Sequence, residues 1–202
     1  MANVKIQGNA SGSGVLTITA PNTDATRTIT LPDATGTLLA GDGSISSLIG
    51  YRALDRIVEY ADVQTSGTHG GTLTSGAWRT RNLAEIIDTN NLGTISSSVI
   101  VLVAGTYYCT GWSIGKQADA HQCRLYNTSD SAIVLQGTCN NSASAQDAGN
   151  LSILSGEFVI AGSKNLELQH RCETTKATTG FGDANSFGDT EVYARIQFRR
   201  IG

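Results

Sequence analysis

Three closely spaced apolar runs between residues 98 and 127 constrain the fold of this chain more than any other feature. The segment reads SVIVLVAGTYYCTGWSIGKQADAHQCRLYN, with a glycine turn after the first run and a polar segment before the third. The runs consist of Val99–Val103, then Tyr107, Tyr108, Cys109 and Trp112, then Cys123, Leu125 and Tyr126. β-Branched and aromatic residues fit a pleated, half-buried surface, and Gly and Asp between short runs mark turns. The segment therefore predicts three consecutive strands, which need more sheet to bury their apolar faces.

The composition agrees with an all-β protein and argues against several functions. Glycine is frequent (23 of 202 residues), and only 2 prolines and 1 methionine are present. Turn residues between short apolar runs are typical of sandwiches and barrels. The net charge of −3 disfavours nucleic-acid binding, which needs Lys and Arg clusters. No apolar run approaches the roughly 20 residues that cross a bilayer, and the N-terminus does not resemble a secretory signal. We therefore expect a protein made soluble in the cell, without membrane insertion.

The N-terminal region, residues 1–43, contains two short strand candidates. Val15–Thr19 and Arg27–Leu31 each alternate apolar residues with threonine, and Pro32 and Gly36 favour a turn after the second. A two-stranded unit is marginally stable alone. We expect it to pack on the rest of the chain or on copies of itself, as a β attachment segment.

Residues 44–60 have the only convincing helical period in the sequence. The periodic positions are Ile45, Leu48, Ile49, Arg52, Leu54, Ile57 and Val58. A short helix with one apolar stripe needs a partner surface. We interpret the segment as a neck where three copies meet through Ile45, Leu48, Ile49 and Ile57. The alternative is a lone helix packed on its own domain.

Residues 61–202 predict one strand-rich domain. Further strand candidates are Ala77–Ile87, Ala132–Thr138, Leu151–Leu154, Gly156–Ala161, Leu166–Cys172 and Thr190–Ile201. The total of roughly eight to ten strands has the spacing of a sandwich or jelly roll. The last strand alternates strictly, with Val192, Ala194, Ile196 and Phe198 on one face.

Several ordered blocks within residues 77–202 then resemble a known family. They are AWRTRNLAEIIDT, AGTYYCTGWS, HQCRLYN, VLQGT, GEFVIAGSKNLELQHRCETT and TGFGDANSFGDTEVYARIQFRRI. Together they resemble the trimeric jelly-roll domain of tumour-necrosis-factor (TNF)-like type in bacteriophage virion proteins, similar in kind to the globular heads of complement and tumour necrosis factor. Separately, GVLTITAPNTDATRTITLPDATGTLL resembles a short segment of phage tail-fibre and other virion appendage proteins.

This resemblance implies an all-β fold and a place in the virion. The expected fold is a C-terminal TNF-like jelly-roll β-sandwich, preceded by a small β N-terminal region and a short helical neck. The expected protein is made in the host bacterial cytoplasm, forms a homotrimer and contacts other virion proteins through its N-terminal segment. Trimerisation also follows from size, because three copies around an axis would bury the apolar faces of the hairpin and the neck.

Two polar segments are the longest predicted loops, and loops on a rigid scaffold often perform recognition. They span residues 138–150 and 173–189. Sugars stack on aromatic rings and bond to amides and carboxylates, so a host-surface glycan is a further expected partner. The candidate receptor-binding residues are Trp112, Phe181, Asp183, Asn185 and Phe187. The alternative for the aromatic residues is core packing or trimer contact, and Trp78, within a long strand candidate, is expected to be structural.

The sequence offers little for catalysis or metal binding. His121 and Cys123 share one strand face, as do His170 and Cys172, and the four would resemble a zinc set if their strands were neighbours. The alternative, which we favour, is thiols packed as small apolar residues and histidines bonded to neighbours, without a disulfide. Two acidic groups, Asp55/Glu59/Asp62 and Asp183/Asp189, are read as solvated charges or turn residues, not as a glycosidase pair or a calcium site. We expect no catalytic residue, no metal and no cofactor.

The leading hypothesis is therefore a non-enzymatic tail fibre or appendage whose trimeric knob attaches to the host surface through multivalent contacts. The alternative is a capsid decoration (cement) protein that bridges and stabilises capsid subunits. A fibre that must reach a receptor usually carries a long shaft, whereas this chain has at most a short neck, which favours a compact knob or cement role. The copy number per particle separates the tail-fibre role from the cement role.

Overall fold

The structure is a computed structural model that describes residues 56–88 and 91–202. These residues form two stacked antiparallel β-sheets and contain no helix. The N-terminal segment 1–43 and residues 44–55 of the predicted neck lie outside the described residues. The end of the predicted helix is wrong, because Ile57–Tyr60 belong to strand β1 (Ile57–Gln64). Residues 58–62 of this strand are all buried, but only Val58 and Tyr60, two positions apart, belong to the apolar core cluster between the sheets, as expected of a strand.

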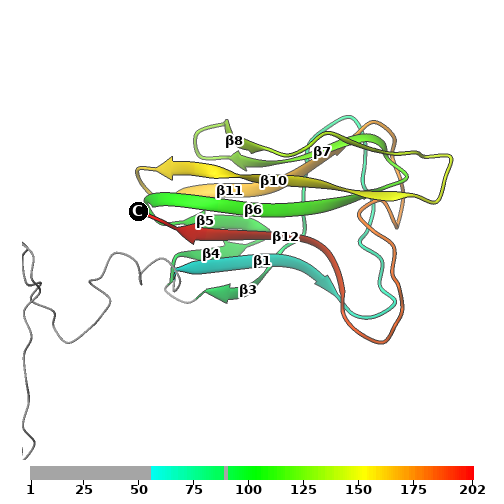
Figure 1. The fold of residues 1–202 in the computed structure, drawn as a ribbon, viewed down its shortest axis with the longest axis horizontal. Helices are drawn as coiled ribbons and strands as arrows, with labels where there is room; N and C mark the ends of the chain where they lie inside the picture. Colours follow the sequence, from blue (N-terminus) through cyan, green and yellow to red (C-terminus); the bar gives the residue numbers. More distant parts are fainter. Residues whose placement is uncertain (1–55, 89–90) are drawn as a thin grey trace, which may run out of the picture. The chain divides into compact units, whose positions relative to one another are not determined.

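The two sheets are shown in Figure 1. The first, which we call the front sheet, has the order β10 (Gly149–Ile160), β6 (Gly105–Lys116), β12 (Glu191–Arg200), β1 and β3 (Ala84–Asp88). The second, the back sheet, has the order β4 (Gly93–Ser96), β5 (Val99–Leu102), β11 (Lys164–Cys172), β7 (Asp119–Asn127) and β8 (Ala132–Gln136). Two short strands extend it, because β2 (Arg79–Thr80) pairs with β11 and β9 (Asn140–Ser142) pairs with β7.

The chain passes repeatedly between the sheets, which gives a jelly-roll strand order. It crosses from β5 to β6 and back to β7, and later from β8 to β10, β11 and β12. Within the described residues, the last strand, β12, thereby pairs with the first, β1. The all-β sandwich expected from the sequence is confirmed for the described residues, and the three runs of residues 98–127 form β5, β6 and β7.

Three sequence-based boundaries are corrected by the structure. The long strand predicted for Ala77–Ile87 is two short strands, β2 and β3, because the chain between them turns inward and buries Arg81 completely. The runs Leu151–Leu154 and Gly156–Ala161 belong to one continuous strand, β10. The predicted loop 138–150 contains β9 and the first residues of β10.

The apolar core lies between the sheets. Phe198 of β12 is fully buried, and the rings of Tyr60, Tyr107 and Phe158 surround it in edge-to-face contacts, with centroids 6.4, 6.5 and 6.0 Å away. Aromatic pairs in this geometry contribute roughly 0.5–1.5 kcal/mol beyond the area they bury. Ala194 and Ile196 are buried beside Phe198, as the alternation of the last strand predicted, whereas Val192 is only half-buried.

The two ends of the sandwich differ. At one end β1 begins and β12 finishes, where the Arg200 N–H donates to the Arg56 carbonyl at 3.0 Å. At the other end lie the connections 65–72, 143–148 and 173–190, which we call the loop end (Figure 1). In residues 56–88 and 91–202, no helix has the length and apolarity to cross a membrane.

Candidate interaction surfaces

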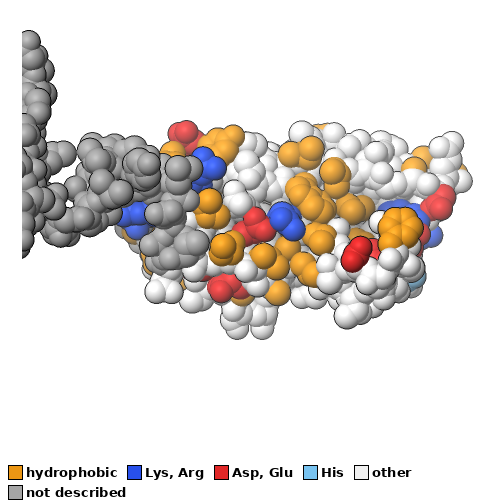
Figure 2. Space-filling view, turned by 60° about the horizontal axis from the view of Figure 1, so that its bottom comes forward, with side chains coloured by type: hydrophobic (Ala, Val, Ile, Leu, Met, Phe, Trp, Pro, Cys, Tyr) orange, Lys and Arg blue, Asp and Glu red, His pale blue; other side chains and the backbone are white. Residues whose placement is uncertain are grey.

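The solvent face of the front sheet is unusually apolar. Side chains on each strand alternate between the core and this face, and several large apolar ones remain exposed. They are Val63, Ile87, Tyr108, Leu151, Ile153 and Val159, with Ile153 50% and Val159 72% exposed. Figure 2 turns the β1–β3 edge forward and shows hydrophobic side chains gathered on this side, with a few acidic and basic ones between them.

Apolar residues on this face pair across strands. Ile153 of β10 lies opposite Trp112 of β6, and Leu151 lies opposite Ile114. Trp112 lies opposite Arg195 on its other side, beside a hollow of about 510 Å³ that these residues line with Ile153. Trp112 is thus placed on the sheet face, away from the loop-end residues with which the sequence analysis grouped it.

A polar group formed by Glu59, Arg195 and Gln197 lies between the two apolar parts of this face. The Glu59 carboxylate accepts from the Arg195 guanidinium at 3.0 Å and from the Gln197 amide at 2.9 Å. Asp62, three residues after Glu59 in β1, is buried and bonded to Arg81. Glu59 and Asp62 therefore have separate partners on opposite sides of β1 and form no carboxylate pair, and Asp55 lies outside the described residues.

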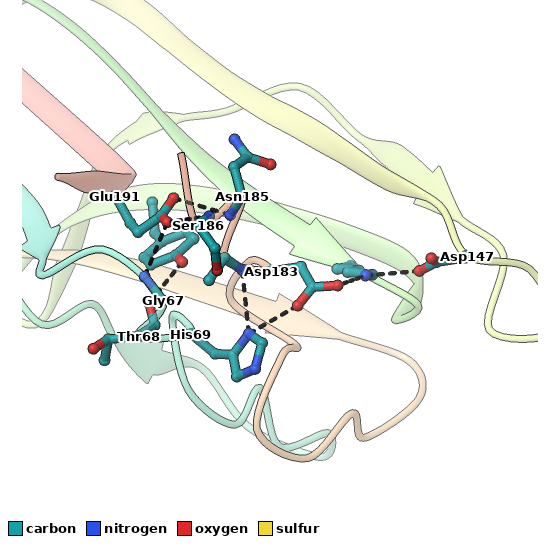
Figure 3. A network of polar contacts seen from close by, with 11 residues as sticks. Gly67, Thr68, His69, Asp147, Asp183, Asn185, Ser186 and Glu191 are labelled. Atoms are coloured by element: carbon teal, nitrogen blue, oxygen red, sulfur yellow. Dashed lines mark hydrogen bonds and ion pairs between the residues drawn. The ribbon is translucent and has the colours of Figure 1, made fainter. Parts of the chain in front are cut away.

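The loop end is organised by the Glu191 carboxylate (Figure 3). It accepts the backbone N–H groups of Gly67, Asn185 and Ser186 at 3.3, 3.2 and 2.9 Å. The Ser186 N–H, followed by that of Asn185, lowers the pKa of Glu191 by stabilising its charged form. This carboxylate thus links the 65–72 and 173–190 connections, which backbone bonds such as that from the Gly70 N–H to the Gly182 carbonyl also join.

Asp183 forms a second link at the loop end. Its carboxylate binds the Lys116 ammonium and lies 2.8 Å from His69 Nδ1, and Lys116 also binds Asp147 at 2.7 Å (Figure 3). The hydrogen bond from Lys116 is the main cause of the lowered pKa of Asp183. These contacts fix Asp183 within an ion-pair network.

The predicted receptor residues therefore occupy different places. Asp183, Asn185 and Phe187 lie together in the 173–190 connection, and Phe187 is 85% exposed. Phe181 is half-buried beneath the Arg81 guanidinium, whose central carbon is 3.8 Å from the ring centroid. Of the predicted trimer-neck residues, Ile45, Leu48 and Ile49 lie outside the described residues, and Ile57 begins β1.

The two His-x-Cys pairs do become neighbours, because β7 and β11 are adjacent. His170 lies opposite Cys123, and Cys172 opposite His121. The two histidines bond to each other at 3.0 Å, however, and the thiols turn apart toward the carbonyls of Ser152 and Leu73. Within the part of the chain that the structure describes, no three or more His, Cys, Asp or Glu side chains gather in a way that could hold a metal ion.

The same cluster contains a serine that cannot act as a nucleophile. Ser113 Oγ is 2.7 Å from His170 Nδ1, but both residues are fully buried, so a substrate has no access. Burial also lowers the pKa of His170 far below its usual value and lowers that of His121. The pKa of the Cys123 thiol rises to about 11, again mainly through burial, which keeps it unreactive.

A groove on the back sheet was not predicted from the sequence. Trp78, which was expected to be structural, lines this groove with Gln122, Asn140, Arg171 and Glu173. These residues belong to separate segments that only the strand pairing brings together, so no local motif predicted the site.

No family model and no curated protein sequence matches this chain. Its structure is similar to the TNF-type protein Eiger of S. frugiperda, at 13% identity and a TM-score of 0.49, covering 73% of this chain and 92% of that one. It is also similar to the globular domain of zebrafish complement 1qA, at 13% identity, a TM-score of 0.46 and coverages of 73% and 98%. The vertex protein P5 of PRD1 gives 15% identity, a TM-score of 0.41 and coverages of 73% and 98%. These sequence identities and TM-scores are too low to transfer a function, so the function has to be argued from the residues of this chain.

Proposed function

We propose that this chain is a non-enzymatic virion structural protein whose jelly roll forms a homotrimeric knob, and that the knob belongs to a tail fibre or appendage that attaches the particle to its host. The observation that supports assembly is the apolar solvent face of the front sheet. The virion assignment rests on the sequence blocks in residues 14–39 and 77–202.

The apolar face favours burial against another copy. Soluble monomers rarely expose large contiguous apolar patches, and those that occur usually mark interaction sites. Complete burial of a side chain such as Ile153 contributes roughly 1.5–3 kcal/mol relative to full exposure. Because Ile153, Val159 and Leu151 are only partly buried in one copy, a neighbour can gain part of this energy at each of them.

The distribution of these residues suits a closed ring. Val63 and Ile87 lie on the β1–β3 side of the face, and Tyr108, Ile153 and Val159 on the β6–β10 side, with the Glu59–Arg195 ion pair between them. A cyclic trimer needs two different patches on each copy, one for each neighbour. In the proposed assembly, the β6–β10 side of one copy packs on the β1–β3 side of the next.

A matched pair of substitutions tests the assembly. Ile153 on the front sheet and Ile133 on the back sheet are 50% and 52% exposed. We expect Ile153→Lys to dissociate the trimer, because each contact loses apolar burial of roughly 1.5–3 kcal/mol and gains a buried charge. Ile133→Lys, the same change on the opposite sheet, is expected to leave the trimer intact. Light scattering would measure both masses, and equal behaviour of the two variants would contradict the assignment of this face.

The role within the virion is tested by copy number. Quantitative mass spectrometry of purified particles should find the chain in a few to tens of copies if it belongs to a tail fibre or appendage. Hundreds of copies would instead support the capsid decoration role, in which the trimer bridges and stabilises capsid subunits. Absence from the particle would contradict both roles.

A further inference from the structure

A groove of about 390 Å³ lies on the back sheet, where β9, β7 and β11 pair. Small-molecule sites typically measure about 300–1,000 Å³, so the groove is large enough for one. Ala120 and Gln122 of β7 and Arg171 of β11 contribute to its lining, and the small side chain of Ala120 leaves room above the sheet.

The aromatic wall of the groove is fixed in advance by its neighbours. The Arg124 guanidinium lies between two rings, 4.1 Å from the centroid of Trp78 and 4.3 Å from that of Tyr126. Arg124 also donates to the Gln169 amide oxygen at 2.9 Å. A ring held in this way loses little freedom when a ligand stacks on it.

The polar groups of the groove suit a ligand with hydroxyls and a negative charge. Arg171 is exposed, and its guanidinium makes no hydrogen bond or ion pair with residues 56–88 or 91–202. Its positive charge lies close enough to Arg124 to lower the pKa of Arg124 further, after burial as the main cause. An anion beside Arg171 would relieve this repulsion, and the planar guanidinium matches a carboxylate with two hydrogen bonds. Asn140 and the Glu173 carboxylate lie at the same groove and can bond sugar hydroxyls.

From these observations we propose that the groove binds an acidic sugar residue of a surface polysaccharide, with its ring stacked on Trp78 and its carboxylate on Arg171. Sugars combine an apolar ring face with a hydroxyl rim, which is the chemistry that Trp78 and the polar groups offer. The proposal rests on the proposed function, because it names the ligand class of the host-attachment knob. The site belongs to the back sheet, so assembly through the front sheet leaves it open.

The test uses tetragalacturonate and sialyllactose as acidic probes and a neutral galactose tetramer as the control ligand. The chain contains 2 tryptophans, so their two indole N–H signals in an NMR spectrum of the full chain can be assigned by substitution. We expect an acidic probe to shift the Trp78 signal in a saturable way and to leave Trp112, on the opposite sheet, unchanged. Absence of saturable binding of both acidic probes at millimolar concentration, or a shift confined to Trp112, would overturn the proposal.

Matched variants separate the groove from other causes. Trp78→Ala and Arg171→Gln should each weaken binding of the acidic probe by about tenfold or more. Lys164→Gln removes the same charge from the same strand, and this variant should bind as the unmodified chain does. If the control variant loses binding and the groove variants keep it, the site lies elsewhere. The NMR spectrum of each variant shows whether it is folded.

The oligomeric state, measured separately, distinguishes the two proposals. A trimer that binds neither acidic probe overturns the groove alone. A solitary chain that binds through Trp78 and Arg171 overturns the trimeric knob and leaves the groove.

Discussion

Arg81 shows how a single residue determines the local fold. Its guanidinium is fully buried, donates to the Asp62 carboxylate at 2.8 Å and stacks on Phe181. Burial is the main cause that lowers the pKa of Arg81 to about 10, which leaves it charged at neutral pH. The buried Arg81 charge needs Asp62 as its partner, so Arg81 has to turn inward toward β1. The chain between β2 and β3 therefore does not continue as one straight strand.

We therefore expect Arg81→Met to destabilise the domain strongly. The substitution leaves Asp62 buried without its cation, which typically costs about 3–5 kcal/mol of unfolding free energy. The double variant Arg81→Met/Asp62→Leu should recover part of this loss. Lys164→Gln, which breaks the more exposed Lys164–Asp130 pair, should cost about 1 kcal/mol or less. Urea denaturation measures all three, and equal losses for Arg81→Met and Lys164→Gln would contradict this account.

The buried histidine pair predicts how stability depends on pH. His170 faces Ser113 of β6, His121 of β7, the Phe181 ring and the Arg81 charge. Burial lowers the pKa values of both histidines, so below their unfolded value of about 6.5 the unfolded chain binds more protons than the folded one. The contribution of the two histidines to the unfolding free energy should be constant above about pH 7 and should decrease as the pH falls through about 6.5.

The His170→Gln variant tests this dependence. Glutamine can still bond to its neighbours but has no proton to gain, so the decrease between about pH 7 and 5 should become shallower. Denaturation of both proteins at several pH values measures the slopes. Identical slopes in this range would contradict the role of the pair.

At the scale of elements, strands were predictable where a strict alternation also matched burial. Ala194, Ile196 and Phe198 alternate in sequence and are buried in β12, so the sequence indicated both the strand and its core face. Ile57 and Val58 fitted a helical period as well as a strand, and only the pairing of β1 with β12 shows that they form a strand. The Trp78 groove depends on cross-strand register between distant segments, which no local pattern records.

The Glu191 carboxylate joins two connections of the loop end, so Glu191→Gln should loosen the backbone around Asn185 and Ser186. The N–H groups of Asn185 and Ser186 would lose a charged acceptor, and their hydrogen exchange should become faster while exchange in the core strands stays unchanged. Because its bonds lower the pKa of Glu191, the stabilisation is complete above its unfolded value of about 4.3 and is lost as the pH falls through the lower folded value. Unchanged exchange at Asn185 and Ser186 in the variant would contradict this role.

At the scale of the whole molecule, the two sheets offer different surfaces. The front sheet presents exposed apolar side chains around the Glu59–Arg195 pair. The back sheet presents a groove with the Arg171 guanidinium, which is unpaired within the described residues. The first suits a permanent contact between copies, and the second suits a polar ligand. Three copies joined through their front sheets would present three such grooves, and this multiplicity strengthens attachment even when each contact is weak.

The native mass of the unmodified chain in solution tests this account most directly. Multi-angle light scattering at micromolar concentration should give three times the chain mass of 21.1 kDa. A stable, folded particle with the mass of one chain would contradict the proposed knob, because the apolar face of the front sheet would then remain exposed to water.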